Sequence, residues 1–147
     1  MSSEATGVSL RVSRTIQVPR AEVFRAWTSP EELRRWHAPG DMAIPLAEVD
    51  LRVGGEFKIR MQAEDGPPHT VTGVYREIDP PRRLVYSWSW VENEAHAGAE
   101  TQVTVEFEER GDATEVILTH EGFPTEEARD SHNQGWVGIL ERMAGAV

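Results

Sequence analysis

The chain has 147 residues, of which 39% are hydrophobic, with no cysteine and a formal net charge of −10 at pH 7. This length buries a sizeable core unaided, so we expect a single domain over residues 1–147, with residues 1–7 as a flexible N-terminus. The lack of cysteine excludes disulfides, thiolate nucleophiles and cysteine-based zinc sites. No apolar run approaches the roughly 20 residues that span a bilayer, and the start lacks a signal-peptide pattern, so we expect no membrane span and a cytoplasmic location.

The negative charge is concentrated between Glu92 and Asp130. This segment holds 12 acidic residues against Arg110 and Arg129, whereas the rest of the chain holds 13 acidic and 13 basic residues. Such a surface repels duplex DNA and anionic membranes, which argues against nucleic-acid binding. Segment 92–130 is interpreted either as the solvated outer face of a sheet or as a docking surface for a basic protein partner.

The first expected element is a half-buried strand over residues 8–18, where apolar and polar residues alternate. Arg14 falls on the apolar phase of this strand. Its charge would need a buried acceptor there, and Glu48 and Glu121 are the candidates.

Two short helices are predicted after this strand. In VPRAEVFRAW, Pro19 suits a first helical turn, and Trp27 lies on an apolar stripe that indicates a position in the core. In SPEELRRW, Ser29 and Glu32 form a Ser-x-x-Glu capping box around the proline at the first helical position.

Period-two alternation dominates the middle of the chain and predicts further antiparallel strands. These strands are expected over residues 47–51, 57–61, 69–78, 84–90, 103–108 and 116–120. Gly54 and Gly55 lie between the first two of them and predict a hairpin turn. With residues 8–18, the segments give a sheet of six or seven strands.

The C-terminal segment TEEARDSHNQGWVGILERMAGAV is predicted to form an amphipathic helix of roughly 20 residues. Its inward stripe recurs at three- and four-residue steps and consists of Ala128, His132, Trp136, Ile139, Leu140 and Met143. Gly135 and Gly138 would each cost about 1 kcal/mol relative to alanine, which indicates close packing or a kink. We expect a curved sheet that grips this helix, with the two short helices closing one end.

Several segments together resemble one known family. VPRAEVFRAWTSPEELRRWHAPG, EVDLRVGG, GVYREIDPPRRLVYSW and LTHEGF occur in this order before a helix that carries GW. They resemble the family named for the C-terminal domain of the activator of the Hsp90 ATPase, in the START-related, Bet v 1-like (SRPBCC) helix-grip superfamily. The resemblance implies an α+β fold in which an antiparallel sheet encloses a cavity that often takes an apolar small molecule or lipid.

The stretch LVYSWSW places three large rings on one face of a strand, because alternate side chains share a face. This face is expected to look toward the C-terminal helix. The candidate ligand-binding residues are Trp36, His37, Met42, Tyr86, Trp88, Trp90, His120, Phe123, His132 and Trp136. The alternative is that these rings simply fill the core, since tryptophans are bulky enough to do so.

The five histidines have different expected roles. His120 and His132 lie on inward phases, where each is either a satisfied core group or a group that hydrogen-bonds a ligand or moves a proton. His37 is expected at the mouth of the cavity. His96 falls in a predicted turn, and His69 is also assigned to a turn, where EDGPPH meets the strand expected from residue 69; both are expected to be solvated.

Other familiar chemistries find no support in the sequence. Ser87 and Ser89 are expected on the solvent face of their strand, which argues against a Ser-His nucleophile pair. The chain has no His-x-x-x-His spacing, no Gly-x-Gly-x-x-Gly motif and no phosphate-binding Gly-Lys-Ser/Thr loop. We therefore expect no catalytic residue, metal or cofactor.

Three classes of function remain. The first is a protein that binds a small hydrophobic or aromatic molecule, such as a lipid or a polyketide-like compound. The second is a pocket enzyme of the cyclase or hydrolase kind, and the third is an Hsp90-type chaperone cofactor, which the name of the resembled family suggests. Binding, by a monomer or weak homodimer, is ranked first because the aromatic lining and the resemblance to the superfamily both favour it. The pocket enzyme is ranked second and the chaperone cofactor last.

Overall fold

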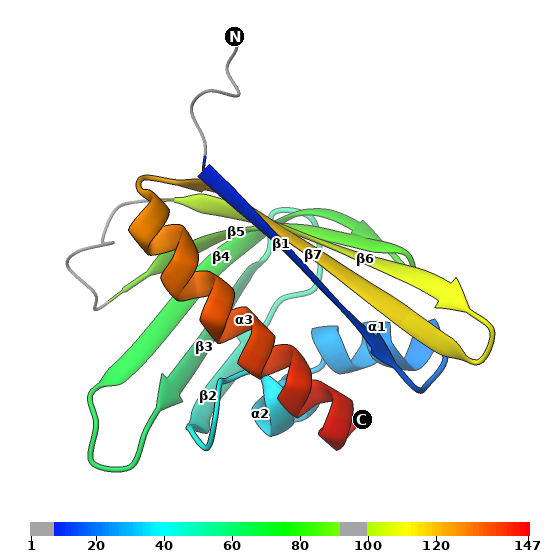
Figure 1. Cartoon of the computed structure of the whole chain (residues 1–147), viewed down its shortest axis with the longest axis horizontal. Helices are drawn as coiled ribbons and strands as arrows, with labels where there is room; N and C mark the ends of the chain where they lie inside the picture. The colour runs from blue at the N-terminus through cyan, green and yellow to red at the C-terminus, as the bar shows by residue number, and fades with distance from the viewer. Residues whose placement is uncertain (1–7, 92–99) are drawn as a thin grey trace, which may run out of the picture.

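The computed structural model describes residues 8–91 and 100–147, so the N-terminal segment 1–7 and His96 lie outside it. Its strands form a seven-stranded antiparallel sheet in the order β1-β7-β6-β5-β4-β3-β2 (Figure 1). Their bounds are β1 Val8–Ile16, β2 Ala43–Val49, β3 Glu56–Gln62, β4 Pro68–Asp79, β5 Arg83–Trp90, β6 Thr101–Arg110 and β7 Ala113–Phe123. Strands β2 to β7 follow one another as neighbours, and β1 pairs with β7.

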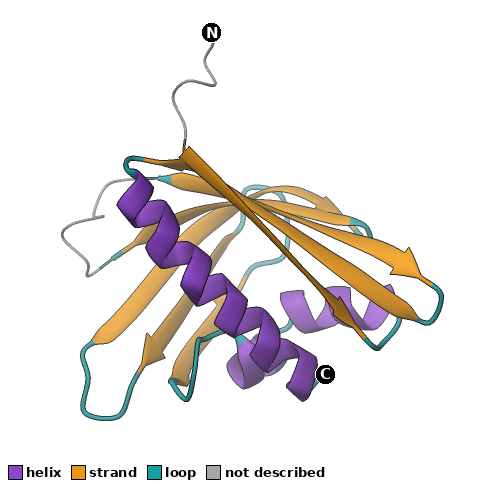
Figure 2. Cartoon of the chain, in the orientation of Figure 1, coloured by secondary structure: helices purple, strands orange, loops and turns teal. Residues whose placement is uncertain are grey.

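Helix α3 (Glu126–Ala146) runs diagonally across one face of this sheet, and its last turns lie beside α2 (Figures 1 and 2). The side chain of Thr125 accepts a hydrogen bond from the backbone N–H of Ala128 at 3.0 Å, which caps the first turn. The stripe toward the sheet is buried as predicted, with Trp136 only 2% exposed. The predicted helix-grip α+β fold is confirmed.

Two short helices, α1 (Arg20–Thr28) and α2 (Pro30–Trp36), follow β1 as predicted. The Ser29 hydroxyl accepts from the backbone N–H of Glu32 at 3.5 Å, which is one half of the expected capping box. Trp27 is 3% exposed and packs edge-on against Trp36, with ring centroids 4.6 Å apart. The Trp27 Nε1–H donates to the hydroxyl of Tyr86 at 3.2 Å, so Trp27 is a core residue that ties the helices to the sheet.

The expectation that Ser87 faces solvent is wrong. Ser87 is 4% exposed, and its hydroxyl accepts from the backbone N–H of Val74 at 2.9 Å. The Ser87 side chain is therefore turned to the neighbouring backbone of β4, close to the point where the register between β4 and β5 shifts, between Tyr75 and Glu77. Gly73 is required beside it, because a Cβ there would collide with the carbonyl oxygen of Ser87.

The expected buried partner for Arg14 is also absent. Arg14 is exposed, and the carboxylate recorded near it is that of Glu141 on α3, with a 4.0 Å Nη1–Oε2 distance. Because β1 is an edge strand of the sheet, the Arg14 side chain reaches water beside α3 and needs neither Glu48 nor Glu121.

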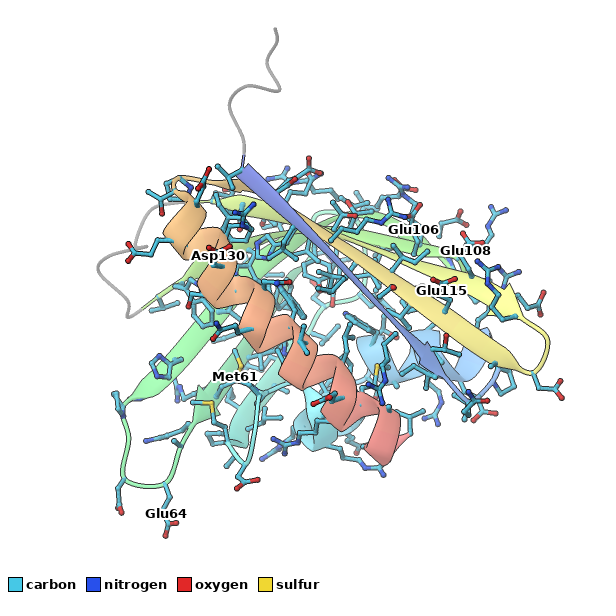
Figure 3. All side chains as sticks on the ribbon, viewed as in Figure 1. Met61, Glu64, Glu106, Glu108, Glu115 and Asp130 are labelled. Atoms are coloured by element: carbon cyan, nitrogen blue, oxygen red, sulfur yellow. The ribbon has the colours of Figure 1, made fainter. Side chains whose placement is uncertain are left out.

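Acidic side chains gather on β6 and β7, away from α3 (Figure 3). Glu106 pairs with Arg83 at 3.3 Å, and Glu115 pairs with Arg110 at 2.8 Å. Both carboxylates therefore already have a cationic neighbour on the sheet. The strands of segment 92–130 thus form the solvated outer face that was expected, whereas Glu126, Glu127 and Asp130 of the same segment lie on α3. A protein partner there stays a prediction.

Candidate ligand-binding pocket

A pocket of about 250 Å³ lies between α3 and strands β3 to β5 and is partly open to solvent. The loop between α2 and β2 supplies one further wall. The pocket is lined by Pro39, Met42, Met61, His69, Trp88, Trp90, Ser131, His132, Gly135, Trp136 and Ile139. Figure 3 labels Met61 on β3, whose side chain lies on the side of the strand that faces the helix.

The structure divides the ten candidate residues into two groups. Met42, Trp88, Trp90, His132 and Trp136 line the pocket. Trp36, His37, Tyr86, His120 and Phe123 are buried in the packed core and do not line it. Near His37 and Tyr86 the remaining space is only about 10 Å³, close to the smallest that holds a single water molecule. The aromatic face of β5 therefore fills the core at one end and borders the pocket at the other.

His120 is held in one tautomer by its neighbours. Its Nδ1 accepts from the Trp136 Nε1–H at 3.0 Å, so the ring proton is on Nε2, which donates to the Thr101 hydroxyl at 2.6 Å. Thr101 in turn donates to the carbonyl of Trp88 at 3.1 Å. Burial, together with the charge that His132 would carry, lowers the pKa of His120 well below its ordinary value. His120 thus acts as a neutral brace that fixes Trp136 in the pocket wall.

His132 is braced in a similar way at the pocket itself. Its Nε2 accepts from the Trp90 Nε1–H at 2.8 Å, so the ring proton is on Nδ1, which donates to the carbonyl of Ala128 at 2.8 Å. Both ring nitrogens are therefore engaged within the protein. His132 fixes the orientation of Trp90, which is another wall of the pocket.

His37 is not at the mouth of the cavity, contrary to expectation. It is 1% exposed and packs against Trp36, Trp88 and Trp136. Burial lowers the pKa of His37 to about 4, so the ring is neutral at physiological pH. The backbone explains its position, because α2 ends at Trp36 and the next residue turns back under the helix toward the core.

His69 is not in a turn, contrary to expectation. It lies in β4 opposite Met61 of β3 and therefore points to the same, helix-facing side of the sheet. The inward phase of Val71 and Tyr75 extends back to position 69 and was the signal for this placement. The wall residues that were not predicted from the sequence are Pro39, Met61, His69, Ser131, Gly135 and Ile139.

Arg142 holds the loop that supplies Pro39 and Met42 to the pocket. Its Nε donates to the carbonyl of Arg35 at 3.1 Å, and its Nη1 donates to the carbonyl of Met42 at 2.7 Å. The loop packs beside α3 at Gly138, where an added Cβ would lie 3.4 Å from the Cβ of Pro39, an ordinary van der Waals contact. Packing against the helix is therefore present at position 138, but it does not require a glycine there.

Acidification is expected to destabilise the protein through its buried histidines. The unfolded chain binds protons to His37 with the ordinary pKa of 6.5, whereas the folded chain does so only near pH 4. Stability contributed by neutral His37 is therefore complete above pH 6.5 and decreases until about pH 4, by about 3 kcal/mol. Urea denaturation of wild type and His37→Leu at pH 7, 5.5 and 4.5 measures this contribution. The curve of unfolding free energy against pH should be flatter for the variant, and parallel curves would contradict the assignment.

Among residues 8–91 and 100–147, no cluster of three or more potential metal-ligating side chains is found. None of the described helices combines the length and hydropathy needed to cross a membrane.

The long C-terminal helix held by a curved antiparallel sheet, with a pocket between them, defines a helix-grip domain of the Bet v 1-like class. The sequence profile described as "Activator of Hsp90 ATPase homolog 1-like protein" (AHSA1) matches residues 17–147. The chain therefore belongs to the AHSA1 family, which is part of the SRPBCC superfamily.

Solved structures resemble this chain over nearly its whole length. A protein from Nitrosomonas europaea is 26% identical with a TM-score of 0.81, and the match covers 99% of this chain and 96% of that one. The AHSA1 protein from Silicibacter pomeroyi is 25% identical, with a TM-score of 0.83 and coverage of 94% and 96%. The AHSA1-like protein from Aeromonas hydrophila is 28% identical, with a TM-score of 0.75 and coverage of 94% and 92%. No curated protein is significantly similar to the chain.

Proposed function

We propose that this protein binds a small, largely apolar aromatic molecule in the pocket between α3 and strands β3 to β5. The observation that carries the proposal is a partly open space of about 250 Å³ walled by three tryptophans and two methionines. Aromatic rings and thioethers offer flat, polarizable surface to an aromatic guest. A fold of this family is compatible with such a role.

The volume of the pocket limits the size of the ligand. A cavity of roughly 150 Å³ is known to hold benzene, and pockets for drug-sized ligands begin at roughly 300 Å³. A space of about 250 Å³ therefore encloses one or two rings. A long lipid or a polyketide-like molecule would extend beyond the opening, so we favour a compact aromatic compound.

The hydrogen bonds of His120 and His132 support a role in shaping the pocket wall over proton transfer by these two residues. His120 and His132 use both ring nitrogens within the protein, so neither has a free nitrogen with which to move a proton on a ligand. What they do instead is fix Trp136 and Trp90 in the pocket wall. A wall that is ordered before binding lowers the entropic cost of taking up a ligand.

The test is a calorimetric titration of the full-length protein with naphthalene, indole and p-cresol, followed also by tryptophan emission. We expect micromolar dissociation constants for at least the two-ring probes, with a change in emission because three indoles border the site. The absence of both heat and emission change across all three probes would contradict the proposed function.

A further inference from the structure

His69 is a half-buried polar side chain of the pocket whose hydrogen-bonding capacity is unused. It is half-buried on β4, points toward α3, and contacts the ring of Trp90 with centroids 6.5 Å apart. Within the described part of the chain, neither of its ring nitrogens makes a hydrogen bond. A neutral imidazole offers one donor and one acceptor, so His69 presents both to the pocket.

The other polar groups that line the pocket offer less. His132 is engaged at both ring nitrogens, and the Trp88 Nε1–H is shielded although it lacks a partner among the described residues. Ser131 lies on α3 and is exposed to water. His69 is therefore the half-buried polar group that can form a hydrogen bond with a ligand entering between α3 and β4.

The absence of charged side chains from the pocket lining favours a neutral ligand. None of the residues that line the pocket is lysine, arginine, aspartate or glutamate, and the whole chain carries a net charge of −10. A carboxylate moved into such a site would lose its hydration without gaining a cationic partner. A neutral hydroxyl avoids this cost, because it needs only one acceptor to replace its bond to water.

We propose that the ligand is an aromatic compound with a ring hydroxyl, and that this hydroxyl donates a hydrogen bond to the unprotonated nitrogen of His69. This inference rests on the proposed function and specifies the chemical class of the ligand. The apolar part of the compound fills the space between the tryptophans, and the hydroxyl lies at the side of the pocket formed by β4.

Naphthalene and 1-naphthol form a matched pair of probes for this inference. A site without a polar partner binds 1-naphthol more weakly than naphthalene, because an unpaired hydroxyl is costly to bury. With His69 as acceptor, we expect the wild-type protein to bind 1-naphthol at least five-fold more tightly than naphthalene. In His69→Phe the preference should reverse. This preference is the ratio of two affinities measured on the same variant, so a general change in the pocket affects both probes and does not imitate the loss of the acceptor.

Two additional arms sharpen this test. His69→Gln keeps an acceptor on a side chain of similar reach, so it should recover part of the preference for 1-naphthol. 1-Naphthoate should bind more weakly than either neutral probe, and tight binding of naphthoate would overturn the assignment to a hydroxyl.

The outcomes separate this inference from the proposed function. Binding of neither naphthalene nor 1-naphthol contradicts the proposed function itself. Binding of naphthalene with an equal or lower affinity for 1-naphthol, or an unchanged preference in His69→Phe, overturns only the role of His69.

Discussion

Replacing Gly135 by leucine is expected to lower the affinity for naphthalene at least ten-fold, which corresponds to about 1.4 kcal/mol, without weakening the fold. Gly135 lines the pocket, and a Cβ added there would have no other atom within 4 Å. Side chains on a helix lean toward its N-terminus, so a leucine at this position covers Ser131 and His132, which also line the pocket. It therefore occupies the space that a ligand would take.

Gly145 provides the matched control on the same helix. A Cβ added at Gly145 also meets no atom within 4 Å, but this residue does not line the pocket. Gly145→Leu should thus leave affinity unchanged, and both variants should be as stable as wild type or up to about 1 kcal/mol more stable. Calorimetric titration and urea denaturation measure these two quantities. Equal affinities for Gly135→Leu and Gly145→Leu would place the ligand elsewhere.

The second large effect is a difference in stability between two tryptophan variants. Trp136→Phe removes the donor to His120 and leaves a buried acceptor without a partner, in addition to the lost ring volume. We expect a cost of about 2–4 kcal/mol in unfolding free energy. Trp88→Phe removes an N–H that has no acceptor among the described residues, which offsets part of its cavity cost. We expect that variant to lose less than about 1.5 kcal/mol.

Urea denaturation followed by far-ultraviolet circular dichroism measures both variants without relying on tryptophan emission. The comparison is internally controlled, because the same substitution is made at two nearly fully buried positions whose rings lie 5.0 Å apart. A loss for Trp88→Phe equal to or larger than that for Trp136→Phe would show that the hydrogen bond to His120 does not decide the difference.

The fold is predictable from the sequence because each strand and helix has its own hydrophobic periodicity. Period-two alternation marks the strands, and the stripe through Trp136 and Met143 marks the face of the long helix. Departures arise where the tertiary arrangement overrides the local pattern. Ser87 is buried with its hydroxyl bonded to the backbone of β4, and Arg14 reaches water because its strand lies at the edge of the sheet.

The site was predictable only in part. The phase of β5 and the stripe of α3 placed Trp88, Trp90 and Trp136 on facing surfaces, and these residues do line the pocket. The alternation of side chains along a strand does not show which rings contact each other and which leave an open space between sheet and helix. That depends on how α3 lies across the sheet and on the turn after α2 that buries His37. His69 was missed because it directly follows the turn residues GPP and was expected to be solvated, although it begins the strand expected over residues 69–78 and strand β4 already starts at Pro68.

The most direct test of ligand binding in this pocket is a correlation spectrum of the five indole N–H groups of ¹⁵N-labelled protein, recorded during a titration with naphthalene. Single Trp→Phe variants assign the five signals. We expect the signals of Trp88, Trp90 and Trp136 to shift with one common dissociation constant, because these rings line the pocket. The signals of Trp27 and Trp36, which pack in the core beside α1 and α2, should stay in place. A titration that shifts none of the three pocket signals, or that shifts all five equally, would contradict the account.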